Sequence, residues 1–146
     1  GQVFMRPANN PFEAINNVLD SISQLNAITI VDFHAEATSE KQAMGWFLDG
    51  KISALFGTHT HVLTYDHSIL PQGTGYITDI GMTGAQNTII GMEKDPIIHQ
   101  FVNGIPCHYT PPKTKNVILN GVVFTIDENT KKTTKIKPIR KQYTLK

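Results

Sequence analysis

The sequence has few of the features that mark a secreted, membrane-bound or highly charged protein. It contains a single cysteine, Cys107, among 146 residues, so no disulfide can form within the chain, as is usual in a reducing compartment. No apolar run approaches the roughly 18 residues of a membrane-spanning helix, and no secretory signal is visible. The formal net charge is only +1, which gives no general attraction to nucleic acids or anionic membranes. We therefore expect a cytoplasmic protein with no membrane partner.

The positive charge that is present gathers near the carboxyl terminus. From residue 131 to residue 146 the chain contains lysines and an arginine but no acidic residue. The alternation in "TTKIKPIRKQYT" favours a β-strand whose lysines face solvent. A nucleic-acid-binding segment is the alternative, and it would depend on Lys135, Lys137 and Arg140.

The pattern along the chain predicts one α/β domain over residues 1–146. Hydrophobic residues make up 40% and charged residues 17%, which is ordinary for a globular protein. The chain starts with Gly1 and strand-like "QVFM", as expected of an internal start. β-Branched apolar runs predict buried strands, and helical spacing predicts helices between them. The predicted order is a helix in 9–26, strand 27–33, helix 39–50, strands 52–56 and 76–80, and a helix in 95–104.

Local signals predict where the helices begin and which faces they bury. Asn10 caps the first helix and Pro11 occupies its first turn. Ser39 and Gln42 fit a capping box for the second helix. The apolar stripe of that second helix is formed by Ala43, Trp46 and Phe47.

The last third of the chain predicts a different organisation. Asp95 caps the third helix, which ends before Gly104. From about residue 105 we expect strands only: "IPCHYT", with Cys107 in the core, then "NVILNGVVFTID" and "KKTTKIKPIRKQYT", joined by the hairpin turn "DENTKK". The predicted fold is therefore a mixed sheet with helices, followed by antiparallel strands.

Three histidines follow the ends of predicted strands. His34 comes after "TIVDF", and His59 and His61 come after "ISALF" in "GTHTHV". Ligands of open α/β sheets gather beyond the carboxyl ends of the strands, so these side chains share one rim. Neutral imidazole is the commonest metal ligand. An isolated His-x-His in a loop is more often exposed and idle, but the neighbouring strand end supplies a third imidazole, which favours a metal site.

Further polar residues surround these histidines. Asp32 lies inside an apolar strand, where a buried carboxylate needs a partner, and Asp79 ends the strand "YITDI". Glu36 is a candidate ligand, acceptor or helix-start charge. Thr58 and Thr60 offer hydroxyls that orient imidazoles or bind oxyanions. We expect these five residues to be structural or to support the site rather than to react.

Longer motifs give the chain a family resemblance. "VDFHAEATSEKQAMGWFLDG", "GTHTHV" and "GYITDIGMTG" resemble the YmdB-like branch of the calcineurin-like metallophosphoesterases, bacterial phosphodiesterases active on 2',3'-cyclic nucleotides. The resemblance runs from "NPFEA" to the final strands. It implies a four-layer α/β/β/α sandwich with two metal ions between its sheets, usually iron or manganese, with zinc, magnesium or cobalt as alternatives. By motif, His34 and His59 would bind one metal and His61 the other, and the enzyme would be a dimer or tetramer.

The resemblance covers only the carboxyl-terminal part of such an enzyme. The family's remaining ligands, an aspartate, a bridging glutamate and an asparagine, belong to Gly-Asp-x-x-Gly, Asn-Gly-Glu-Asn and Gly-Asn-His patterns that this sequence lacks. We therefore expect the chain to need an amino-terminal half before it assembles a dinuclear centre and hydrolyses a nucleotide phosphodiester. The competing hypotheses are a non-catalytic binding module with one vestigial metal, and the nucleic-acid association described above. The glycine-rich loop 81–92 is expected either at the substrate mouth or at an oligomer contact.

Overall fold

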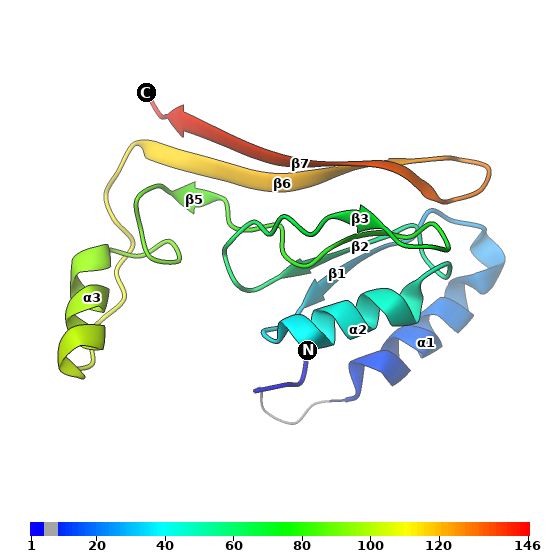
Figure 1. Cartoon of the computed structure of the whole chain (residues 1–146), viewed down its shortest axis with the longest axis horizontal. Coiled ribbons are helices and arrows are strands. Elements are labelled where there is room, and N and C mark those ends of the chain that lie inside the picture. The colour runs from blue at the N-terminus through cyan, green and yellow to red at the C-terminus, as the bar shows by residue number, and fades with distance from the viewer. Residues whose placement is uncertain (5–8) are drawn as a thin grey trace.

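The computed structural model describes residues 1–4 and 9–146 and arranges them in stacked layers. Two helices lie against one face of a four-stranded sheet, and a second sheet lies over its other face (Figure 1). Apolar side chains of both helices pack on the first sheet, among them Phe12, Met44 and Leu48. The helices are α1 (Pro11–Ile22), followed by the short 3₁₀ helix η1 (Ser23–Leu25), and α2 (Thr38–Leu48).

The first sheet has the predicted mixed character. Its strand order is β1-β2-β4-β3, in which β1, β2 and β4 are parallel and β3 is antiparallel to β4. Buried Phe33, Leu55 and Tyr76 contribute to the core on this sheet. The strands are β1 (Ile30–His34), β2 (Ala54–Thr58), β3 (Ser68–Ile69) and β4 (Gly75–Ile77).

The second sheet contains the long carboxyl-terminal hairpin. It joins β5 (Gly84–Ala85), β6 (Asn116–Ile126) and β7 (Thr133–Thr144) in antiparallel order. The two sheets touch closely, since a Cβ placed on Gly75 would lie 2.8 Å from the Phe124 ring and 2.8 Å from the Thr133 hydroxyl. The predicted turn at 127–132 and the solvent-facing lysines of β7 are confirmed.

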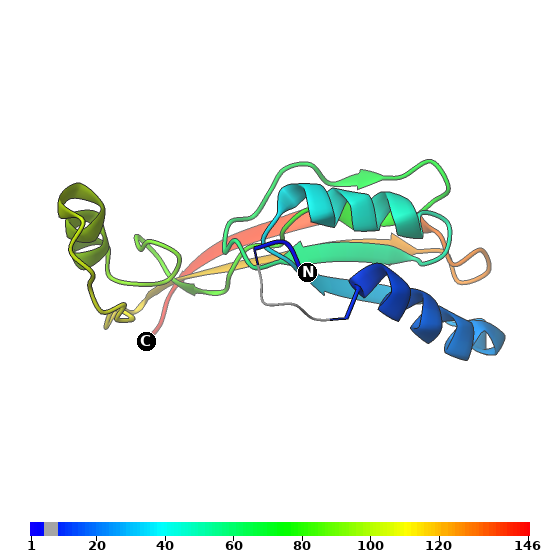
Figure 2. The ribbon, with the colours of Figure 1, turned by 90° about the horizontal axis from the view of Figure 1, so that it is seen from below.

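The third helix, α3 (Lys94–Asn103), projects away from the two sheets (Figures 1 and 2). It ends as predicted at Gly104, which has a left-handed φ of 69°. Its cap is Glu93, one residue before the helix, rather than the predicted Asp95. No helix in the described ranges is both long and apolar enough to cross a membrane.

The predicted start of the first helix is confirmed, whereas the prediction for the second is wrong in two respects. Asn10 Oδ1 accepts a hydrogen bond of 2.9 Å from the backbone N–H of Phe12. Helix α2 instead begins after Ala37, whose side chain cannot cap, so no capping box forms. Of its expected apolar stripe, only Phe47 packs against the core, whereas Ala43 is exposed and Trp46 is 61% exposed. The buried face carries Lys41, because the sheet below supplies a carboxylate partner that the local pattern does not show.

Three expected strands differ from the structure. Residues 105–110 form no strand, because no neighbouring strand pairs with them, and Cys107 is half-buried rather than part of the core. Residues 2–4 are not in a strand, and Met5, the last residue of "QVFM", lies outside the described residues. Strand β4 ends at Ile77, so Asp79 lies beyond the strand rather than at its end.

Candidate functional site

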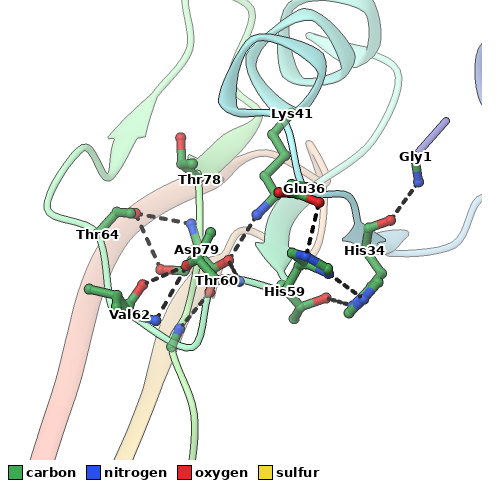
Figure 3. Close-up of polar contacts among 12 residues, drawn as sticks. Gly1, His34, Glu36, Lys41, His59, Thr60, Val62, Thr64, Thr78 and Asp79 are labelled. Carbon is green, nitrogen blue, oxygen red and sulfur yellow. Dashed lines mark hydrogen bonds and ion pairs between the residues drawn. The ribbon is translucent and has the colours of Figure 1, made fainter. Parts of the chain in front are cut away.

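The ends of β1 and β2 bring two of the predicted histidines together. His34, the last residue of β1, is paired in register with Thr58, the last residue of β2, and His59 follows directly. The Nδ1 atom of His59 lies 3.0 Å from Nε2 of His34, with the rings edge to face at 75° (Figure 3). Adjacent parallel strands therefore do what the sequence predicts, which is to bring imidazoles from distant segments to one point.

A polar chain behind His34 determines which of its nitrogens is free. The Thr58 hydroxyl donates to Asp32 Oδ1 at 2.9 Å, and its oxygen lies 3.0 Å from His34 Nδ1. Because the hydroxyl proton is directed to Asp32, Thr58 accepts the proton of Nδ1, and the Nε2 lone pair of His34 faces His59. Asp32 is exposed rather than buried as expected, but it has the partner that was predicted.

Glu36 plays the corresponding part for His59. Its Oε2 atom lies 3.6 Å from Nε2 of His59 (Figure 3), and both side chains are accessible, at 52% and 32% exposure. A carboxylate on this side favours a proton on Nε2, which leaves Nδ1 as the nitrogen that faces His34.

His61 is held separately. Its Nδ1 atom lies 2.8 Å from the carbonyl oxygen of Ile90, in the predicted glycine-rich loop 81–92. That contact directs the proton to Nδ1 and leaves Nε2 without one. In residues 1–4 and 9–146, no group of three or more His, Cys, Asp or Glu side chains converges on one point. The three histidines are therefore arranged as a pair and a separate single ring.

Asp79 anchors the loop that carries His59 and His61. Its Oδ2 accepts from Lys41 Nζ at 2.8 Å and from the backbone N–H of Thr60 at 2.9 Å, and its Oδ1 accepts from Gly81 N at 2.9 Å (Figure 3). Burial raises the pKa of Asp79, but these donors outweigh it and hold the pKa below its usual range. Asp79 is thus a structural ionised carboxylate, and the hydroxyl of Thr60 lies 3.3 Å from the carbonyl oxygen of Val62.

Lys41 is the site residue that the sequence did not reveal. Its side chain is fully buried against Asp79 although it lies on a helix whose pattern predicted a different inner face. The one available signal was an apolar strand ending in an aspartate, which requires a cation or several donors. Nothing local to residue 41 identifies it as that cation.

The backbone of the loop is unusual at both histidines. His59 has φ of 120° and His61 has φ of 65°, values that non-glycine residues adopt rarely and mostly at functional sites. Gly57 precedes them where β2 passes very close to the next strand, since a Cβ there would lie 1.8 Å from the carbonyl oxygen of Thr78. Only glycine fits at that position, so the start of the loop is held in place beside Thr78.

The paired nitrogens have a spacing that suits one metal ion. Imidazole nitrogens lie about 2.1 Å from a bound transition metal, so two such ligands at a right angle are about 3 Å apart. His34 Nε2 and His59 Nδ1 are separated by 3.0 Å. Their outer nitrogens are hydrogen-bonded or face an acidic group, as in protein metal sites. The pair can contribute two nitrogens to a metal, but the described residues do not complete a metal site by themselves.

Curated proteins with similar sequences are phosphodiesterases or are described as putative ones. The chain is 46% identical over 139 residues to the 2',3'-cyclic-nucleotide 2'-phosphodiesterase of Bacillus subtilis, a match that covers 95% of this chain and 52% of that protein. It is 42% identical over 132 residues to a putative phosphatase/phosphodiesterase of Mycoplasma pneumoniae, covering 90% and 46%. The chain spans about half the length of the curated relatives it matches.

Solved structures also match this chain over nearly its whole length. A hypothetical protein from Thermus thermophilus superposes with a TM-score of 0.86 at 35% identity, covering 97% of this chain and 54% of that one. A structure described as a novel phosphatase from Mycoplasma pneumoniae gives 0.83 at 38% identity, covering 96% and 50%. The family model described as YmdB-like protein matches residues 1–139. With the strand-end histidines in place and the match spanning nearly the whole chain, this protein belongs to the YmdB-like family.

Proposed function

We propose that the chain forms part of a metal-dependent phosphodiesterase that hydrolyses 2',3'-cyclic nucleotides or related phosphodiesters. The observation that carries this proposal is the 3.0 Å approach of His34 Nε2 and His59 Nδ1, with the other nitrogen of His34 hydrogen-bonded to Thr58 and that of His59 facing Glu36 at 3.6 Å. The activity named for the Bacillus subtilis relative supports the choice of substrate.

In this proposal the histidines hold two metal ions, iron or manganese, with zinc, magnesium or cobalt as alternatives. His34 and His59 bind one ion, and His61 binds the other through Nε2. Such a pair of metals would supply Lewis-acid binding of the phosphate and a water molecule with a lowered pKa. Asp32 acts through Thr58 to fix the His34 ring, and Glu36 fixes the His59 ring. Asp79 holds the loop through the backbone of Thr60.

The remaining ligands must come from outside this chain. Three neutral imidazoles do not neutralise two divalent ions at a dinuclear spacing of about 3.5–4 Å. We propose that an amino-terminal half, present in the longer relatives, supplies the carboxylates and completes a four-layer α/β/β/α sandwich. The outer face of the second sheet, which such a half would cover, exposes Leu119, Val123 and Tyr143.

The oligomeric state and the cellular location of the protein are also proposals. The projecting helix α3 exposes Phe101 and Val102, at 77% and 75%, and large apolar side chains of this kind are typical of interaction surfaces. They support the expectation of a dimer or tetramer. The cytoplasm remains the expected location because the chain has one cysteine.

Metal content and turnover of the complete enzyme test the proposal together. Alanine variants of His34, His59 and His61 should each lose bound metal and at least about 100-fold in hydrolysis of 2',3'-cyclic AMP and of bis-p-nitrophenyl phosphate. His99→Ala is the matched control, since that histidine is exposed on α3. If the His59 and His61 variants keep full metal content and full turnover, the proposed enzyme function is wrong. If the complete protein binds one metal ion but hydrolyses neither substrate, the non-catalytic module is favoured.

A further inference from the structure

A pocket opens beside His61, between the loop that follows β2 and the inner face of the second sheet. Its volume is about 560 Å³, within the usual range of about 300–1,000 Å³ for small-molecule sites. His61 and Tyr65 line it from the loop, and Met82 lines it from the segment before β5. The pocket therefore adjoins the histidine that the proposed function assigns to the second metal.

The second sheet supplies the polar wall of this pocket. Asn120 of β6 is paired in register with Arg140 of β7, and Ile118 is paired with Gln142, so these side chains share the inner face. Gln86 joins them from the residue after β5. Primary amides both donate and accept hydrogen bonds, which is the chemistry that reads the edge of a nucleobase.

One of these amides has an unmet hydrogen bond. Asn120 Nδ2 donates to the carbonyl of Met82 at 2.8 Å, while its Oδ1 is buried and has no partner in the described part of the chain. Buried acceptors are normally paired. An unpaired acceptor on a residue that lines the pocket is a candidate partner for a donor such as the amine of a base.

Two planar groups at the pocket are free to stack on a base. Tyr65 is 89% exposed, and its ring is nearly perpendicular to that of His67, with ring centroids 5.2 Å apart. Arg140 is exposed and makes no ion pair within residues 1–4 and 9–146. Aromatic rings and guanidinium planes are the surfaces on which proteins stack unpaired bases. The exposed ring of Tyr65 is therefore available to stack on a base that enters the pocket.

We infer that this pocket binds the nucleoside part of the substrate, with the base stacked on Tyr65 and Arg140 and its edge facing Asn120 and Gln142. The inference rests on the proposed function, because it places the phosphate at His61 and extends the nucleoside away from it. It predicts selectivity for a nucleotide over a simple phosphodiester, which has no base to place in the pocket. Asn87 and Thr88 from the glycine-rich loop also line this pocket, which places that loop at the substrate mouth.

Substrate comparison in the complete, metal-loaded enzyme tests the inference. In Tyr65→Ala the KM for 2',3'-cyclic AMP should rise about 5- to 150-fold, the range expected for one lost base-stacking contact. The kcat/KM for bis-p-nitrophenyl phosphate should fall far less, so the ratio between the two substrates changes. Arg140→Ala should change the ratio in the same direction. Tyr109→Ala is the matched control, since Tyr109 is exposed and lies outside the pocket lining.

Direct binding separates failure of the pocket from failure of the proposed function. Saturation-transfer NMR with adenosine should show contact from the base protons in the wild type and its loss in Tyr65→Ala. An unchanged substrate ratio in both pocket variants, with bis-p-nitrophenyl phosphate still hydrolysed, would overturn the pocket and leave the phosphodiesterase. If the wild type hydrolyses neither substrate, the phosphodiesterase fails, and adenosine binding that depends on Tyr65 would still support the pocket. Adenosine binding that Tyr65→Ala leaves unchanged would overturn it.

Discussion

Two contacts to a carboxylate support the site, one from a lysine and one from a histidine, and they differ in their surroundings. Lys41 and Asp79 are 2.8 Å apart and fully buried. His59 and Glu36 are 3.6 Å apart, with both side chains open to solvent, and His59 is charged only when protonated. The first pair lies under the histidine loop, and the second lies beside the paired imidazole rings.

The difference shows that position decides what an ion pair contributes. A buried charge that loses its partner is strongly unfavourable, so the Lys41–Asp79 pair fixes the loop in one arrangement. An exposed pair is screened by water and contributes little to stability. The exposed pair can therefore orient the His59 ring and favour a proton on one of its nitrogens. The buried pair stabilises the fold.

Breaking the buried pair should have the largest effect on stability. Lys41→Met keeps the length of the side chain but leaves the Asp79 carboxylate buried without its cation. We expect the free energy of unfolding to fall by about 3–5 kcal/mol, measured by urea denaturation at neutral pH.

A double variant shows whether the isolated charge is the cause. Lys41→Met combined with Asp79→Asn removes the unpaired negative charge and should recover part of the lost stability. If Lys41→Met unfolds at the same urea concentration as the wild type, the pair does not hold the loop. If the double variant is less stable than Lys41→Met, the loss comes from packing rather than from charge.

Acid should weaken the protein through the same aspartate. Because the pKa of Asp79 lies below its unfolded value of about 3.9, its contribution is complete above that pH and is lost as the pH falls through the folded-state pKa. Urea denaturation from pH 7 to pH 3 should therefore show a falling free energy of unfolding below about pH 4.

A second aspartate acts in the same direction and can be separated. Burial raises the pKa of Asp66, but hydrogen bonds from Thr78 and Thr64 outweigh it and lower the pKa. Asp79→Asn and Asp66→Asn should each flatten part of the acid-induced decline. If the free energy of unfolding falls as steeply with decreasing pH in both variants as in the wild type, other carboxylates cause the decline.

Changing the exposed pair should have the smallest effect. Glu36→Gln removes the charge beside His59 but retains a hydrogen-bond acceptor. We expect a change in the free energy of unfolding below about 1 kcal/mol, measured in the same urea experiment. A loss as large as that of Lys41→Met would show that the two pairs are energetically alike and would contradict the comparison.

Much of the fold follows from local sequence patterns. The cap at Asn10, the end of α3 at Gly104 and the hairpin turn at 127–132 are each read from residues within a few positions of one another. The strands before His34 and His59 are predicted by their β-branched and apolar runs. Local signals are not always sufficient, since α2 begins after Ala37 and α3 after Glu93 rather than at the predicted caps.

The other errors arise where a partner distant in the sequence decides the outcome. The buried face of α2 depends on Asp79, which lies 38 residues after Lys41. Residues 105–110 have strand-like side chains, but no strand lies beside them to pair with. The separate position of His61 depends on the carbonyl of Ile90 in another loop.

By itself, the sequence determined that three histidines lie at or just after the ends of buried strands, and it singled them out as candidate site residues. It did so because helix caps, strand runs and loop glycines act over a few neighbouring residues. Only the tertiary structure decided that His34 and His59 meet at 3.0 Å, that Lys41 is buried, and that a pocket opens beside His61. These features depend on segments that folding brings together, where burial and hydrogen bonding between distant residues set the geometry.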